Sequence, residues 1–182
     1  MPTIWYMGEN MFTKIDLCSM ALLKLGEKPI QSFADDSAAA QLARTLFDPI
    51  TDSLIASHPW RFATQVFELA KTDDGDFVIP SNVLRIIKCP GQMQNGRISA
   101  PQDTIKIVAL TRVAPESYPS YFVSLLATKL AMDFCVPMTG DHNVFRMLAA
   151  LYETEYASAK FIDSTTTTSA NIEDFSLVNT RF

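Results

Sequence analysis

The chain changes from helical to β-type patterning within the stretch Leu54-Ile-Ala-Ser-His-Pro-Trp-Arg-Phe-Ala63. Pro59 ends the helix that leads into this stretch, because the residue before a proline avoids the α-helical region. From Trp60 to about Val113, β-type residues alternate with polar ones between turn signals. The switch predicts helices before His58 and a β-rich insert over about residues 60–113.

Two helices are expected before this stretch. Over about residues 11–25, apolar residues recur every three or four positions, and Gly26 follows as a stop signal. A second helix is expected over about residues 36–57, where Asp35-Asp36-Ser37 offers N-cap oxygens and negative charge for the first turn. Pro49 lies inside this pattern. Because an apolar stripe continues through it, we expect one kinked helix rather than two short ones.

Turn signals divide the β-rich insert into short strands. Asn95-Gly96 is the strongest hairpin signal in the chain, because both residues tolerate a positive φ. In Thr104-Ile-Lys-Ile-Val108, the two isoleucines share one side and Lys106 takes the other. These patterns predict a small antiparallel sheet.

Two further helices are expected after the insert, over about residues 120–136 and 141–161, separated by Pro137-Met-Thr-Gly140. They should form an antiparallel helical hairpin. The first of the two is apolar nearly all round, so it must be buried on several sides. In a chain of this size, we expect a neighbouring copy to cover part of that surface, which predicts self-association.

The predicted fold is mainly α: an antiparallel bundle of about four helices with a small inserted antiparallel β-sheet. We expect an N-terminal segment (1–10), one domain (11–162) with one main core, and an extended C-terminal arm (163–182) that begins in a polar run. Apolar side chains suggest that this arm docks on another surface. The expected contact residues are Ile172, Phe175, Leu177, Val178, Arg181 and Phe182. Packing on its own domain, or fraying, is the open alternative.

Composition limits the classes of function. Of the 182 residues, 48% are hydrophobic and 19% are charged, as expected of a folded chain, and the net charge of −5 argues against a protein that wraps nucleic acid. Cys18, Cys89 and Cys135 are expected to be buried, reduced thiols. There is no secretory signal pattern and no run of about 18 apolar residues. We expect a soluble chain with no membrane partner, made in the cytoplasm.

The sequence holds few candidates for catalysis. His58 and His142 lack metal-ligand spacing, and no nucleotide-binding or nucleophile-elbow motif is present. We expect His58 to cap a helix end, and the pairs Asp35-Asp36 and Asp73-Asp74 to serve as helix cap and turn. No catalytic residue, metal ligand or cofactor is therefore predicted. Two rival classes stay open: a cell-wall hydrolase, which needs two carboxylates brought together, and a small DNA-binding module with salt-dependent affinity.

Three motifs in order carry a family resemblance. Ala21-Leu-Leu-Lys-Leu-Gly-Glu-Lys-Pro-Ile30, continuing through Ser32, Asp36 and Ser37, resembles the ALxxLGxxPI opening of a phage adaptor family. That family includes tail tubular protein A and the podophage tail accessory factors. The stretch from Leu54 to Ala63 resembles its LLxxHPWxFA signature. Phe77-Val-Ile-Pro-Ser-Asn-Val-Leu-Arg85 is similar to its YxLPxDxLR element, with Asn82 where an acid is more usual. The resemblance is softer after residue 85, where Leu126-Ala127 and Leu130-Ala131 loosely match LAxxLA repeats.

The resemblance implies a structural virion protein and not an enzyme. Such a protein is a head-to-tail adaptor (connector) that forms a ring, typically a dodecamer, binds the portal protein and meets a tail or nozzle protein. The resemblance also implies that the C-terminal arm contacts the portal or a neighbouring subunit. It sits at the head-tail junction of the virion, after assembly in the host cytoplasm, and double-stranded DNA passes through it without specific binding during ejection. The motif residues are expected to be structural: Leu25, Gly26, Pro29, Ile30, Asp36, His58, Pro59, Trp60, Phe62, Pro80 and Arg85.

Overall fold

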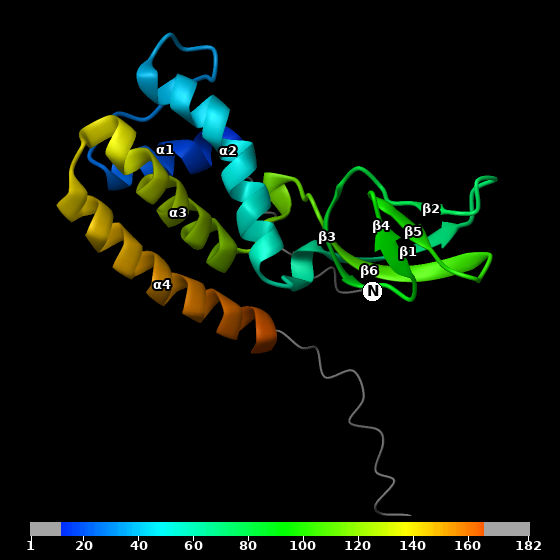
Figure 1. Cartoon of the computed structure of the whole chain (residues 1–182). Coiled ribbons are helices and arrows are strands. Elements are labelled where there is room, and N and C mark those ends of the chain that lie inside the picture. The colour runs from blue at the N-terminus through cyan, green and yellow to red at the C-terminus, as the bar shows by residue number, and fades with distance from the viewer. Residues whose placement is uncertain (1–11, 166–182) are drawn as a thin grey trace, which may run out of the picture.

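The computed structural model describes residues 12–165. In Figure 1 the helices gather on one side of the molecule and the strands on the other. The helices are α1 (Lys14–Lys24), α2 (Ala38–Ser57), α3 (Ser120–Thr139) and α4 (His142–Thr165), with 3₁₀ turns η1 (Arg61–Ala63) and η2 (Pro115–Ser117). The strands are β1 (Thr64–Ala70), β2 (Phe77–Val78), β3 (Val83–Lys88), β4 (Gln92–Gln94), β5 (Arg97–Ser99) and β6 (Thr104–Thr111). A mainly helical protein with inserted antiparallel strands is thus confirmed.

Both ends of α1 follow from its sequence. Thr13 is the N-cap, and its Oγ1 accepts from the Asp16 N–H at 3.2 Å while the Asp16 carboxylate accepts from the Thr13 N–H at 2.8 Å. At the other end Gly26 has φ +75°, and its N–H donates to the Leu23 carbonyl. The Glu27 N–H donates to the Leu22 carbonyl. These two bonds close the helix with the left-handed glycine that the sequence predicts.

One helix, α2, runs through Pro49 as expected. Its N-cap is Ser37, whose Oγ accepts from the Ala40 N–H at 3.1 Å. We expected negative charge in the first turn of α2, and this prediction is wrong, because that turn contains no acidic residue. Asp35 instead accepts from the N–H groups of Gln31 and Ser32, each at 3.1 Å, and so closes the preceding loop.

The last two helices are longer than predicted. Pro137 does not end α3, which continues to Thr139 and stops at Gly140 with φ +65°. The Thr139 hydroxyl donates to the Cys135 carbonyl at 2.8 Å and so satisfies an acceptor in that last turn. Likewise α4 passes residue 161 and reaches Thr165, so the polar run expected to open the arm starts inside a helix. The remainder of the arm and the N-terminal segment lie outside the described residues.

As its composition predicts, α3 is buried on several sides. It packs against α1, α2 and α4, and Val136, at 43% exposed, is its one largely exposed aliphatic residue. It is also long and apolar enough to cross a membrane by length and composition, yet 56% of that window is buried within the chain. The chain's own helices therefore cover much of this surface, and coverage of the rest by a neighbouring copy stays a prediction.

The insert forms two three-stranded antiparallel sheets where one was expected. The strand orders are β1-β6-β3 and β2-β5-β4. Asn95 and Gly96, both at positive φ, make the predicted hairpin between β4 and β5. Two sheets form because β6 has two apolar faces: Leu110 points to the helices, while Ile107 and its alternating neighbours point to the second sheet.

The described residues contain one main apolar core, as expected, and a smaller second core that we did not expect. The larger core joins the four helices to Trp60, Ala63 and Leu110. The smaller one lies between the sheets and includes Phe77 and Ile98, both fully buried. On the surface, the Arg112 guanidinium forms a bidentate pair with the Asp52 carboxylate and ties β6 to α2.

The cysteines follow the prediction in two of three cases. Cys18 and Cys135 are fully buried free thiols, whereas Cys89 is only half-buried beside the turn at Gly91. Burial raises the pKa of the Cys18 thiol to about 12. It therefore stays protonated and packs as a small apolar side chain.

Candidate functional site

The motif stretch from Leu54 to Ala63 forms the junction between the helices and the first sheet. Trp60 is fully buried there, and its indole N–H donates to the Leu54 carbonyl at 3.0 Å, which satisfies an acceptor at the end of α2. Its ring lies 5.4 Å from the Phe122 ring and 6.0 Å from the Tyr156 ring, centroid to centroid. Trp60 therefore joins α2, α3 and α4 at one point.

Phe62 extends the same aromatic cluster toward the sheet. Its ring centroid lies 4.7 Å from that of Phe122 and 5.9 Å from that of Tyr118. Because Phe62 belongs to η1, which leads directly into β1, these contacts hold the start of β1 against α3.

A buried carboxylate, Asp163, lies beside the junction at the end of α4. Only 2% of this residue is exposed, and its oxygens accept from the Tyr121 hydroxyl at 2.7 Å and from the Arg61 backbone N–H at 3.2 and 3.3 Å. These bonds compensate for the loss of hydration that burial of a carboxylate entails. Asp163 thereby fastens the last turn of α4 to α3 and η1.

Sequence reasoning missed Asp163 because we placed it in the polar run of the arm. A signal was present: Leu148, Ala159 and Asp163 are buried residues of α4, and spacings of eleven and four return to the same face of a helix. An acidic residue in an apolar stripe does not predict burial unless its partners are known, and those partners come from distant segments.

His58 connects the motif to this carboxylate. Its ring packs edge-on against Trp60 at 4.7 Å, and its Nε2 lies 3.9 Å from the nearer Asp163 oxygen. Burial lowers the pKa of His58 below 6.5, although the charge of Asp163 opposes this effect; Lys160 and Arg85 add to the lowering. His58 is the residue after α2, as predicted, and its charged neighbour is Asp163.

This cluster fits an anchor better than a catalytic centre. The bonds to Tyr121 and Arg61 already occupy the Asp163 oxygens, and burial keeps the pKa of Tyr121 well above its usual range, so its hydroxyl stays protonated. No serine, threonine or cysteine is bonded to His58 within residues 12–165 in the manner of an activated nucleophile. Over the same residues, no group of three metal-binding side chains is found.

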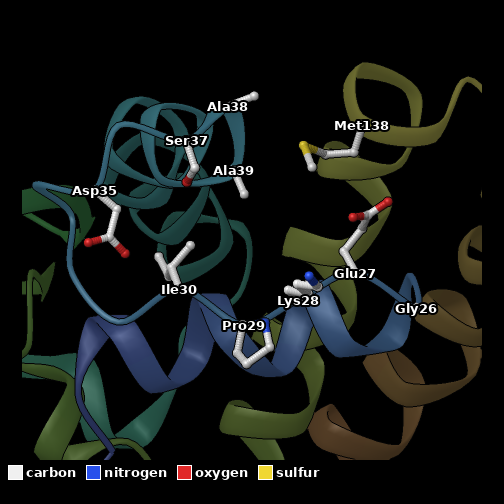
Figure 2. A pocket seen from close by; sticks show the side chains of 10 residues that line it. All are labelled: Gly26, Glu27, Lys28, Pro29, Ile30, Asp35, Ser37, Ala38, Ala39 and Met138. Carbon is white, nitrogen blue, oxygen red and sulfur yellow. The ribbon is translucent and has the colours of Figure 1, made fainter.

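The first motif, Ala21–Ile30, lines an open pocket of about 520 Å³ at the other end of α2. Its walls are the loop after α1, the start of α2 and Met138 of α3, and Figure 2 shows Met138 across the pocket from Ala39, with Ile30 on the wall near Asp35. Ile30 is buried, as the resemblance implies, and its carbonyl accepts from the Ser19 hydroxyl at 3.1 Å. The wall carries both signs of charge, on Glu27, Lys28 and Asp35, so no single ligand charge is favoured.

The remaining motif residues occupy structural positions. Leu25 is the C-cap of α1, whereas Pro29, Asp36 and Pro59 are exposed in loops. The Pro80 carbonyl accepts from the Val83 N–H at 3.0 Å and leads into β3. Arg85 is an exposed residue of β3 opposite Leu110.

The two acidic pairs, Asp35-Asp36 and Asp73-Asp74, lie in separate parts of the structure, whereas a hydrolase would need two carboxylates close together. Asp35 closes the loop before α2, and Asp74 pairs with Arg97 at 3.5 Å in the turn before β2. In Figure 1 these two segments lie at opposite ends of the molecule. The predicted contact residues of the arm lie outside the described residues: Ile172, Phe175, Leu177, Val178, Arg181 and Phe182.

No protein-family model matches the chain, and no curated protein matches it significantly.

Proposed function

We propose that the chain is a head-to-tail adaptor subunit of a bacteriophage, of the tail tubular protein A and podophage tail accessory factor family. In this proposal the four helices act as an antiparallel bundle, the sheets project from it, and the arm extends from α4. Copies form a dodecameric ring that binds the portal protein on one side and a tail or nozzle protein on the other. The ring belongs to the virion and assembles in the host cytoplasm.

The observation that carries the proposal is that the second motif forms the junction between the helices and the first sheet. His58 of this motif lies 3.9 Å from Asp163, which fixes the end of α4, and packs on Trp60, whose ring contacts those of Phe122 and Tyr156. Every one of these contacts is explained by packing or by satisfaction of a buried group. These motif residues hold the helices, the first sheet and the last turn of α4 together. A structural role of this kind suits a subunit that functions by assembly.

The same geometry favours a structural role over the rival classes. The acidic pairs are separated and already used in a loop and a turn, so a hydrolase built on them has no support. The net charge of −5 favours a wall along which DNA slides without being held. We therefore propose no enzymatic activity, no cofactor and no specific DNA binding.

Co-sedimentation with the portal protein encoded in the same genome tests this function. The full chain should migrate with portal rings at a fixed ratio, whereas an unrelated acidic protein of similar size should not. Binding to duplex DNA that weakens steeply with added salt, in the absence of portal binding, would instead favour the DNA-binding module.

A further inference from the structure

One side of α4 is exposed and carries no charge. We name it the outer α4 face, formed by Met147, Ala150, Leu151, Thr154, Ser158 and Phe161. Met147 is 72% exposed and Phe161 is 68% exposed, more than any other large apolar side chains in the described residues. The opposite side of α4 packs on α3, and in Figure 1 α4 runs along the edge of the molecule.

This face differs from an ordinary solvated helix surface. Exposed helix faces usually carry charged side chains, and α4 places Arg146 and Glu153 only beside this strip. Its large apolar groups lie at its two ends, Met147 and Leu151 near the start of α4 and Phe161 near the end, with the uncharged Thr154 and Ser158 between them. An uncharged strip with exposed large apolar groups on a folded chain marks a contact surface.

We propose that residues 172–182 of the same chain bind the outer α4 face while the protein is free in solution. This segment offers apolar groups to match the face, at Ile172, Phe175, Leu177, Val178 and Phe182. The inference does not depend on the adaptor function, because it concerns the chain alone.

The length of the intervening chain fits this contact. From Phe161 back to Met147, α4 rises about 21 Å at 1.5 Å per residue. Residues 166–171 span up to about 20 Å when extended, and their threonine-rich sequence contains no proline or large apolar residue. They suffice for the chain to reverse at Thr165 and return along the same helix.

Because residues 172–182 are attached to α4, they bind the outer α4 face in preference to a second copy of the chain. A short linker holds its segment at an effective concentration on the order of millimolar. Separate copies at micromolar concentration compete poorly with it for the same face. The attached segment is therefore the occupant of the free protein, and a partner that recruits the segment uncovers the face.

Methionine oxidation measures this coverage in the full chain. Met147 lies on the outer α4 face, and Met93, at 60% exposed, lies on β4 in the second sheet and serves as the internal control. Peroxide oxidation of each is followed by peptide mass spectrometry and divided by its rate in guanidinium. We expect Met147 to react several-fold more slowly than Met93, although it is the more exposed of the two in residues 12–165.

Substitutions in the segment complete the test. Phe175→Asp combined with Phe182→Asp should bring Met147 to the rate of Met93 and leave Met93 unchanged, whereas the matched control Asn179→Asp should preserve the protection. Equal rates for the two methionines in the unmodified chain, or protection that survives the double substitution, would overturn the proposal. Protection that grows with protein concentration would overturn it too, because a second copy would then be the occupant.

Discussion

Single residues at the junction and at the helix ends stabilise the fold through specific hydrogen bonds and backbone conformations. Asp163 exchanges hydration for bonds to Tyr121 and Arg61, and Gly26 supplies the left-handed backbone that ends α1. The sequence predicted Gly26 because a helix stop is a local signal. The sequence did not predict the burial of Asp163. A buried carboxylate is stable only with hydrogen-bond donors, and those of Asp163 lie about 40 and 100 positions away in the chain.

Replacement of Asp163 should destabilise the protein. Asp163→Ala leaves the Tyr121 hydroxyl and the Arg61 N–H without their acceptor, so the free energy of unfolding should fall by about 2–3 kcal/mol in urea titrations. Asp163→Asn keeps one acceptor oxygen and should lose less. If the alanine and asparagine variants both unfold at the urea concentration of the original protein, the hydrogen bonds of Asp163 contribute nothing to the free energy of unfolding.

Gly26 should resist substitution despite the open space around it. A Cβ at this position meets no atom within 4 Å, so the cost of Gly26→Ala comes from its φ of +75° alone. We expect a loss of about 1 kcal/mol in thermal or urea unfolding. Lys28→Ala, in the same loop, is the matched control and should change stability little. An equally stable Gly26→Ala protein would contradict the helix-end geometry.

His58 should make stability depend on pH in a defined direction. Its pKa is lower in the folded chain than its usual 6.5, so below pH 6.5 the unfolded chain binds more protons than the folded one. Its contribution is therefore complete above pH 6.5 and declines as the pH falls through and below that value. Urea midpoints measured between pH 7 and pH 5 should fall more steeply for the original protein than for His58→Gln. Parallel slopes would contradict the pKa direction.

Secondary-structure elements were largely predictable in kind and less so in their ends. Apolar patterns and breaker residues placed all four helices, and the turn signal of Asn95-Gly96 placed the hairpin between β4 and β5. Pro137 misled the prediction for α3 and the threonine-rich run did so for α4, because both are local stop signals. Tertiary contacts outweighed them: Cys135 is fully buried one turn from the end of α3, and Asp163 holds the last turn of α4.

The end of α4 can be tested by two truncations. A chain ending after Phe161 loses Asp163 and should be destabilised by about as much as Asp163→Ala, roughly 2–3 kcal/mol. A chain ending after Thr165 retains the anchor and should unfold at a higher urea concentration than the chain ending after Phe161. Equal stability of the two truncated chains would show that the last turn of α4 contributes nothing.

At the scale of the whole molecule, the division into two cores separates a helical part from a projecting pair of sheets. The sequence indicated the β-rich insert but not its second sheet, since strand pairing joins segments that no local pattern connects. Likewise the apolar composition of α3 suggested a neighbouring copy, and the structure covers much of that helix with α1, α2 and α4. Exposed apolar surface lies instead on α4, at Met147, Leu151 and Phe161.

The central claim of the adaptor proposal is that this chain assembles on the portal protein. The most direct measurement is electron microscopy of the full chain mixed with portal rings from the same genome, beside the chain that ends after Thr165. The account predicts a second ring of this protein stacked on the portal, built from the full chain and weakened or lost with the truncated one. Portal rings that remain bare at saturating concentrations of the full, folded chain would contradict it.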